Sequence, residues 1–387
     1  MKRSLLVALA ALISALLALA TPARALERNF AGSAQLDYVL VPTAQNVKTF
    51  PKAFDGFTME LAGKLAVDFS DHVSANLKVC YGCHGFEADM MYFDVRVVDE
   101  LNLRIGRFSP SFGAFNLRHD PANHRLSDKP LPYDMGRMLR MRQWNMSVLP
   151  SPFPDNGLEI NGTKFIGESA QLDYAVYGVT GFKANLRPTE INFQLSRSPQ
   201  NYYVENNGRP TVGARLALTY KLGDASDLTA GVSGMGGTYD PENHESYFIG
   251  GADLSLRLDK TNIRLEYLAR RTSFDVSDRG VFKYNVASAR GDFFVKHGAY
   301  AEIEQGLTPE LDLIARVDGM ARLGNVEAAS ELSRRASVIR YTLGTAYAIE
   351  RGLRLKFSTE LWQFSDRDLA SGRQVELTMH AALAGSF

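Results

Sequence analysis

The chain has 387 residues, of which 43 are basic and 43 acidic, so its formal net charge is zero at pH 7. The absence of a basic surplus to neutralise phosphates argues against a nucleic-acid partner. No linker, low-complexity run or long repeat divides the chain, and its 32 glycines are spread throughout. We therefore expect one continuous architecture rather than several domains.

The first 25 residues predict a secretory signal peptide. Lys2 and Arg3 form a charged start, an apolar run follows over residues 5–20, and Ala23-Arg24-Ala25 is a small-x-small cleavage site. Cleavage before residue 26 leaves 40 basic against 43 acidic residues, a net charge of −3. No later apolar run approaches the roughly 20 residues that a membrane helix needs. Residues 26–387 are thus predicted to be exported.

The dominant pattern after residue 25 is strict alternation of apolar and polar residues, which predicts β-strands. From Phe57 to Phe69, for example, Met59, Leu61 and Leu65 alternate with polar residues such as Lys64. The same period of two recurs in further segments: 73–80, 92–97, 101–106, 216–222, 263–269, 311–317, 353–361 and 375–387. The sequence Gly234-Met235-Gly236-Gly237 we interpret as the end of a loop, not a nucleotide site.

Amphipathic strands occur both in soluble sandwiches and in transmembrane barrels, and three features favour the barrel. The strands approach the ~10 residues that cross a bilayer at a tilt, and short turns alternate with long polar loops. The polar faces also carry full charges, as a water-filled lumen permits: Lys64, Arg96, Arg104, Arg215, Arg264, Arg316 and Arg354. At roughly 20 to 24 residues per strand and connection, we predict an all-β antiparallel barrel of about 16 strands, with 14 to 18 as the range.

The last predicted strand places Val375, Leu377 and Met379 on one face and ends on Phe387. This ending resembles the assembly signal of bacterial outer-membrane proteins. The segment from Phe57 to Phe115 in turn resembles the phosphate-selective porin O and P family, through Met59–Leu65, the strand around Lys78, and Leu103-Arg104-Ile105-Gly106-Arg107-Phe108-Ser109-Pro110-Ser111-Phe112-Gly113. The proline is shifted by one place from the family pattern.

The resemblance implies a 16-stranded, trimeric porin with an in-folded third loop, in the outer membrane of a Gram-negative bacterium among its lipid and lipopolysaccharide. It does not carry phosphate over as the solute, because the family's anion-binding residues find no match here. The Cys-x-x-Cys-His sequence described below is not part of the family pattern either.

Residues 109–156 break the alternation for nearly fifty residues, and long loops of this kind are commonly functional. Folded into the lumen, the loop would narrow the pore and favour anions. Left outside, it would be a solvated extracellular loop whose arginines meet lipopolysaccharide or its own acids. The predicted pore-lining residues are Lys64, Arg96, Arg104, Arg118, Arg137, Arg140 and Arg142.

Both cysteines of the chain lie in Cys80-Tyr81-Gly82-Cys83-His84. This is the attachment signature of a c-type haem, in which Cys80 and Cys83 bind the vinyl groups and His84 ligates the iron. His119, His124, Met135 or Met138 in the long loop would be candidates for the distal ligand. Counting turns places the motif at the extracellular end of its hairpin.

Two alternatives to the haem stay open. Cys80 and Cys83 could form a disulfide in the oxidising periplasm, or both thiols could be free. A zinc site is poorer, because only three candidate ligands cluster. One haem cannot cross a membrane ~30 Å thick, so electron transfer would need partner cytochromes.

Two hypotheses of function follow. The first is an outer-membrane porin for passive diffusion of small hydrophilic, anionic solutes, with or without one haem. The second is a porin-scaffolded c-type cytochrome that transfers electrons at the outer membrane. An enzyme is not expected, because no spaced acid/base pair, nucleophile elbow or Gly-rich phosphate cradle stands out from the strand pattern.

Overall fold

The structure is a computed structural model, and it describes residues 27–42, 56–82, 85–134, 147–183, 202–273, 293–324, 337–365 and 374–387. The predicted signal peptide lies outside these residues. The same holds for several predicted site residues: Cys83, His84, Met135, Met138, Arg137, Arg140 and Arg142.

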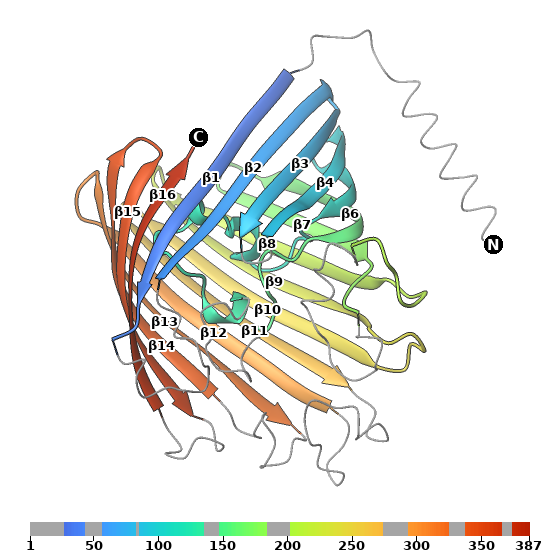
Figure 1. Ribbon diagram of the computed structural model, residues 1–387. Helices are drawn as coiled ribbons and strands as arrows, with labels where there is room; N and C mark the ends of the chain where they lie inside the picture. The colour runs from blue at the N-terminus through green and yellow to red at the C-terminus, as the bar shows by residue number, and fades with distance from the viewer. Residues whose placement is uncertain are drawn as a thin grey trace, which may run out of the picture.

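The described residues form a closed barrel of sixteen strands, in which each strand pairs with its chain neighbours and β1 pairs with β16. All pairings are antiparallel. The predicted fold class and strand number are therefore confirmed (Figure 1). The strands are β1 (Glu27–Leu40), β2 (Gly56–Ser70), β3 (Val73–Gly82), β4 (Gly85–Val98), β5 (Leu101–Phe108), β6 (Asp155–Ile166), β7 (Ala170–Val179), β8 (Thr211–Gly223), β9 (Ser226–Thr238), β10 (Ser246–Leu258), β11 (Thr261–Ser273), β12 (Phe293–Gly306), β13 (Leu311–Gly324), β14 (Ser337–Glu350), β15 (Leu353–Ser365) and β16 (Gln374–Ser386).

The alternating sequence sorts apolar side chains to the outside of the barrel. Phe57 is 72% exposed and Met59 49% exposed, because they face outward. Exposed aromatic residues gather in two belts, one near each end of the barrel, as in barrels that cross a membrane. One belt includes Tyr38, Phe57, Phe86 and Phe248, and the other includes Phe30, Phe69, Phe165, Tyr220 and Tyr347. Among the described residues, no helix is long and apolar enough to span a membrane.

One local prediction was wrong. Gly234–Gly237 does not end a loop but lies inside β9, where Gly236 pairs with Val212 and Phe248 on its two neighbours. Close approach explains a glycine here, since a Cβ on Gly237 would lie 2.2 Å from the Thr211 hydroxyl oxygen. A glycine-rich run is therefore compatible with a strand when the neighbouring strand fills the space.

The two ends of the barrel carry different connections. Even-numbered strands lead to the next strand through short turns, such as 71–72, 99–100 and 351–352, all at one end. The opposite end carries the long connections 41–55, 109–154, 180–210 and 274–292. β3 also ends and β4 begins at this long-loop end, where the count of turns places their hairpin.

Candidate functional site

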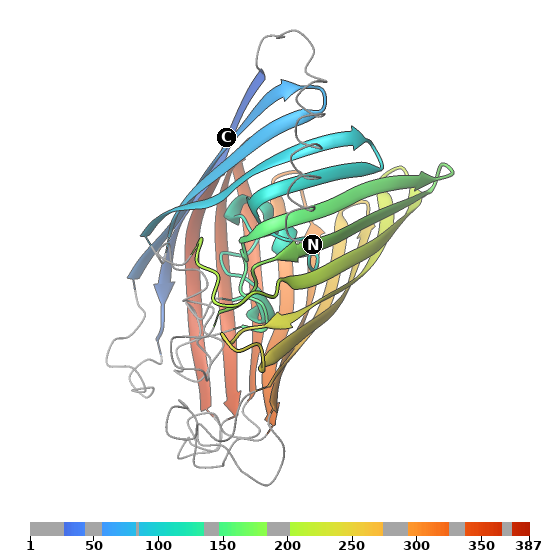
Figure 2. The ribbon, with the colours of Figure 1, turned by 90° about the vertical axis from the view of Figure 1, so that its right-hand side faces the viewer.

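The described part of the connection between β5 and β6, residues 109–134 and 147–154, lies inside the barrel, and we call it the inward loop. Figures 1 and 2 both show its described part, including three short 3₁₀ helices, within the ring of strands. These helices are η2 (Asn116–Arg118), η3 (Pro121–Asn123) and η4 (Leu131–Tyr133). The loop buries apolar side chains against the inner wall, in one cluster that includes Phe112, Phe115, Leu131, Leu268 and Met320.

The first part of the inward loop is hydrogen-bonded to Glu266 of β11. This buried carboxylate accepts hydrogen bonds from the backbone N–H groups of Ala114, at 2.9 Å, and Phe115, at 3.2 Å. It also accepts from the hydroxyl of Tyr300, at 3.0 Å, and from that of Tyr133 in η4. Four donors satisfy a charge that burial alone would strongly disfavour. Glu266 thereby holds two separate parts of the loop against one strand.

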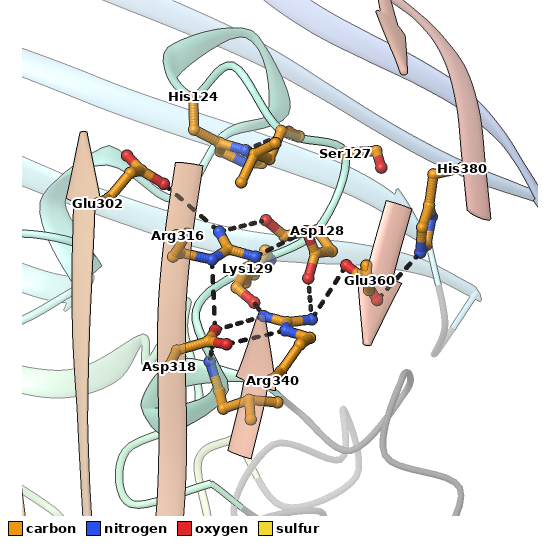
Figure 3. Close-up of polar contacts among 12 residues, drawn as sticks. His124, Ser127, Asp128, Lys129, Glu302, Arg316, Asp318, Arg340, Glu360 and His380 are labelled. Carbon is orange, nitrogen blue, oxygen red and sulfur yellow. Dashed lines mark hydrogen bonds and ion pairs between the residues drawn. The ribbon is translucent and has the colours of Figure 1, made fainter. Parts of the chain in front are cut away.

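The middle of the inward loop is held by two arginines, which Figure 3 shows between carboxylates of the loop and the wall. Arg316 of β13 donates to Asp128 of the loop at 2.8 Å. Arg340 of β14 also donates to Asp128, and its Nε donates to Asp318 of β13 at 2.9 Å. We call these four residues the arginine clamp. All are buried, so removal of one charge would leave the others with less compensation.

Two glycines of the wall make room for the inward loop. A Cβ on Gly344 of β14 would lie 2.5 Å from Cδ2 of Leu126. A Cβ on Gly298 of β12 would lie 3.0 Å from Cγ of Pro132. Both distances are shorter than ordinary van der Waals contact, so a larger residue would push the loop side chain away from the wall.

On the opposite side, the inward loop meets β2 and β3 through Asp120. Lys78 of β3, which is buried, lies 2.8 Å from the Asp120 carboxylate, and Lys64 of β2 forms a second ion pair with it. The Nζ of Lys78 also lies 2.6 Å from Nε2 of His119. Burial alone would raise the pKa of Asp120, but His119, Lys78 and Lys64 hold it well below its usual range.

His119 is engaged at both ring nitrogens. Nδ1 donates to the Asn116 carbonyl oxygen at 2.7 Å, so Nε2 is the acceptor that faces Lys78. Burial, followed by the charge of Lys78, lowers the pKa of His119 to about 3. The imidazole is therefore neutral at physiological pH and serves to hold the loop, so neither nitrogen is available to a metal in this arrangement.

His124 occupies a different place. Its Nδ1 donates to the Leu126 carbonyl oxygen at 2.7 Å, the same oxygen that accepts from Lys356 of β15 at 3.1 Å. Its Nε2 is buried without a hydrogen-bond partner among the described residues. Burial is the main cause that lowers the pKa of His124 well below its usual value. The structure thus separates the two histidines, with His119 toward β3 and His124 toward β15.

Cys80 lies on the inner face of β3, opposite Glu87 of β4. Its Sγ donates to Asp89 at 3.6 Å, and Lys78 lies 3.3 Å from the same carboxylate. These described contacts are charged groups, not the apolar surface against which a porphyrin packs, so this part of the wall does not fit a haem. Cys83 and His84 lie outside the described residues, and the haem and the Cys80–Cys83 disulfide both stay predictions.

The side of the lumen along β5 to β8 is hollow. A cavity of about 210 Å³ separates the inward loop from this wall, and its lining includes Ser111 and Leu117 of the loop with Arg104, Glu159 and Arg215 of the strands. A second cavity of about 820 Å³ opens toward the short turns. The two share four lining residues: Arg104, Asn161, Gly162 and Thr163. Together they form a polar passage from the short turns to the inward loop, which we call the polar route.

The arginines of this route are paired with acids. Arg104 lies 2.8 Å from Asp94 and 3.5 Å from Glu159, and Arg215 lies 2.6 Å from Asp253. Arg96 lines the larger cavity near the short turns. Arg118 on η2 is different, because in the described part of the chain its side chain forms no ion pair, and its buried Nε has no hydrogen-bond partner.

The sequence pattern suggests that every inner-facing arginine meets the water of the lumen, but the structure shows that some do not. Arg316 is 4% exposed beneath the inward loop, where it belongs to the arginine clamp. Sequence analysis also missed Asp128, Glu266 and Arg340 as residues that hold the loop. The only available signal for Glu266 and Arg340 was a charged residue on the polar face of a strand, which many positions share, and Asp128 in the loop carried no such signal.

No protein-family model matches the chain, and no curated protein sequence matches it. Several solved structures resemble it in fold. The outer membrane channel DcaP of Acinetobacter baumannii has a TM-score of 0.56 at 11% identity, over 95% of this chain and 100% of that chain. The anion-selective porin from Comamonas acidovorans has a TM-score of 0.54 at 9% identity, over 94% and 100%.

The trimer form of OmpT, an outer membrane protein of Vibrio cholerae, has a TM-score of 0.53 at 8% identity, over 94% of this chain and 100% of that chain. At such identities the likeness concerns the course of the backbone alone. With a closed sixteen-stranded wall and an inward loop, the chain has the fold of outer-membrane porins.

Proposed function

We propose that the protein is an outer-membrane porin, a passive channel for small hydrophilic solutes that favours anions. The observation that carries this proposal is the polar route between the inward loop and β5–β8. An apolar outer surface bounded by two aromatic belts supports a place in a membrane. The predicted signal peptide and the predicted C-terminal assembly signal support export to the outer membrane of a Gram-negative bacterium.

Arg118 supports the preference for anions. It lies on the inward loop next to Leu117, which lines the smaller cavity, and no ion pair joins it to a carboxylate among the described residues. A cation that is not neutralised raises the local concentration of anions in a low-dielectric channel. Arg104 and Arg215 contribute less, because acids pair with both.

Planar-bilayer recording of the purified full-length protein tests this proposal. We expect a steady ohmic conductance, and a reversal potential in a KCl gradient that indicates anion preference. Arg118→Gln should shift that reversal potential toward zero, whereas Arg28→Gln, on the outer face of β1, should leave it unchanged. Absence of conductance would reject the channel, and a cation-selective reversal potential would reject the anion preference.

We further propose that the channel is a homotrimer, as the family resemblance implies. A trimer is also the form recorded for the structurally similar OmpT of Vibrio cholerae. Multi-angle light scattering of the detergent-solubilised protein measures the protein mass. A mass of one or two chains would contradict the trimer without affecting the channel proposal.

The c-type haem on Cys80, Cys83 and His84 is tested separately, since Cys-x-x-Cys-His is its attachment signature. The mass of the mature chain is measured under denaturing and reducing conditions. The mass of one added haem would establish the cofactor and open the alternative function in electron transfer. The bare polypeptide mass would reject it, and a change of two hydrogens on reduction would identify the Cys80–Cys83 disulfide.

A further inference from the structure

An apolar groove crosses the outer face of β10 to β15. It consists of two adjoining hollows of about 800 Å³ and 670 Å³ that share Leu265, Ala301 and Val317. The hollow arises where small residues meet in register, since Ala299 pairs with Gly319. Larger side chains such as Tyr341 and Leu343 stand beside it, 45% and 60% exposed. The barrel is therefore not smooth here.

Two basic side chains lie on the outer face at the long-loop end of this groove. His297 lines the groove, and its ring centroid lies 6.0 Å from that of Tyr267. Ala269 of β11 pairs with His297, and Arg271 is the next residue of β11 that faces outward. Its guanidinium lies 4.3 Å above the ring of Phe293 and is exposed. A cation at the edge of a membrane-facing wall is stabilised by an anionic headgroup.

The length of the groove suits an acyl chain. From His297 to Ile303 on β12, the lining covers six residue steps, or about 20 Å of strand. Because the strands of such barrels are tilted by about 40°, this corresponds to about 15 Å along the membrane normal, the depth of one leaflet of a bilayer whose hydrocarbon core is ~30 Å thick. The groove thus reaches from the headgroup level into the hydrocarbon, with its charged end at the long loops.

We propose that this groove binds lipopolysaccharide, with acyl chains in the groove and a phosphate against Arg271 and His297. The proposal rests on the proposed function, because an outer-membrane porin exposes its long loops on the side where this glycolipid forms the leaflet. Charge complementarity favours a phosphate-bearing lipid as the occupant. The combined size of the two hollows favours a lipid with several acyl chains over a two-chain phospholipid.

The test is a titration of the full-length, detergent-purified protein with purified lipopolysaccharide, and separately with phosphatidylglycerol, read by native mass spectrometry. The double variant Arg271→Gln/His297→Gln should bind lipopolysaccharide about fivefold to tenfold more weakly. Ala301→Phe, which fills the groove, should abolish specific binding. Arg28→Gln and Ala381→Phe, on the outer faces of β1 and β16, are the matched controls and should bind normally.

Three results would overturn the proposal: equal binding by Ala301→Phe, equal affinity for phosphatidylglycerol, or a smaller oligomer in Ala301→Phe without a change in lipid. The last result would assign the groove to a second copy of the chain. Conductance and heat-modifiable mobility of each variant are measured in parallel and verify folding. Since binding and conductance are read independently, failure of the lipid site leaves the channel proposal standing, and the reverse also holds.

Discussion

The wall under the inward loop and the wall along the polar route have the same alternating sequence pattern but different inner surfaces. Under the loop, the side chain of Arg316 is 1% exposed and that of Arg340 is fully buried. Along the route, the side chain of Arg104 is 23% exposed and borders a cavity. The comparison teaches that alternation assigns a residue to the inner face, whereas the loop decides whether that face meets water.

The largest difference between the two walls should appear on removal of Arg340. Arg340→Met leaves Asp128 and Asp318 buried with less compensation, which we expect to cost about 3–5 kcal/mol of loop attachment. Hydrogen exchange of the Leu131 amide, which donates to Asp318, reports this loss. Arg257→Gln is the control, because its ion pair with Asp227 is half exposed. Equal exchange in both variants would contradict the arginine clamp.

A smaller effect is expected from the space that the wall provides for the loop. Gly344→Val places carbon atoms where Leu126 lies, and overpacking of this kind costs about 1–3 kcal/mol. Leu126→Ala in the same chain should recover part of the loss, measured as the thermal midpoint of the two single variants and the double variant. Strict additivity of the two changes would show that these side chains do not meet.

The third effect is a pH dependence confined to the β3 side of the loop. The pKa of His119 is about 3 in the docked loop and about 6.5 when exposed, so the undocked loop binds the extra proton. The stabilisation is complete above pH 6.5 and decreases as the pH falls, by about 1.4 kcal/mol at pH 5.5. Lys78, Lys129, Asp89 and Asp120 surround the imidazole, and the lysines strengthen the effect.

Hydrogen exchange of the His119 region at pH 7 and pH 5.5, corrected for intrinsic rates, measures this dependence. In His119→Gln the corrected protection should change less between the two pH values, because Asp120 keeps its charge throughout this range and only His124, whose pKa burial also lowers, remains to take up a proton. The same pH dependence in wild type and variant would assign it to another group.

The smallest effect compares two lysines on one carboxylate. Lys64 and Lys78 both pair with Asp120, but their side chains are 47% and 5% exposed. Lys64→Gln should therefore change the thermal stability by at most about 1 kcal/mol, as for exposed ion pairs. Lys78→Gln should cost more, because it leaves Asp89 and Asp120 buried beside a neutral group. A larger loss in Lys64→Gln would contradict the burial argument.

The sequence predicted much of the fold because each strand carries its own signal. Phe57–Phe69 and Val375–Phe387 alternate, and the chain length predicted about sixteen strands, the number that the closed barrel has. The residues that hold the loop carry no such local signal. Arg340 and Asp128 are 212 positions apart, and their contact depends on where the loop packs. The need for a glycine at position 344 becomes evident only when the structure shows Leu126 opposite it.

The Cys-x-x-Cys-His motif shows the opposite case. Its local sequence signal for a haem is strong, but the side chains that surround Cys80 are charged, whereas a haem packs against apolar ones. Sequence spacing alone identifies the haem pattern, but it does not reveal what faces Cys80. The structure places Lys78 and Asp89 there, in a strand rather than at the start of a helix. Local patterns therefore predict elements well, and they predict sites only where the neighbours across the fold agree.

The inward loop also bears on how the barrel closes. Closure joins β1 to β16, whose paired residues Ser33 and Ser386 come from opposite ends of the chain. Near this seam, Lys356 of β15 donates to Gln35 of β1 at 2.9 Å and to the Leu126 carbonyl oxygen of the loop, while Gln35 donates to the Ser127 carbonyl oxygen at 2.7 Å. The loop thus links β1 to β15, the neighbour of β16, and a chain that lacks it should close more slowly and expose the β1 and β16 edges to aggregation for longer.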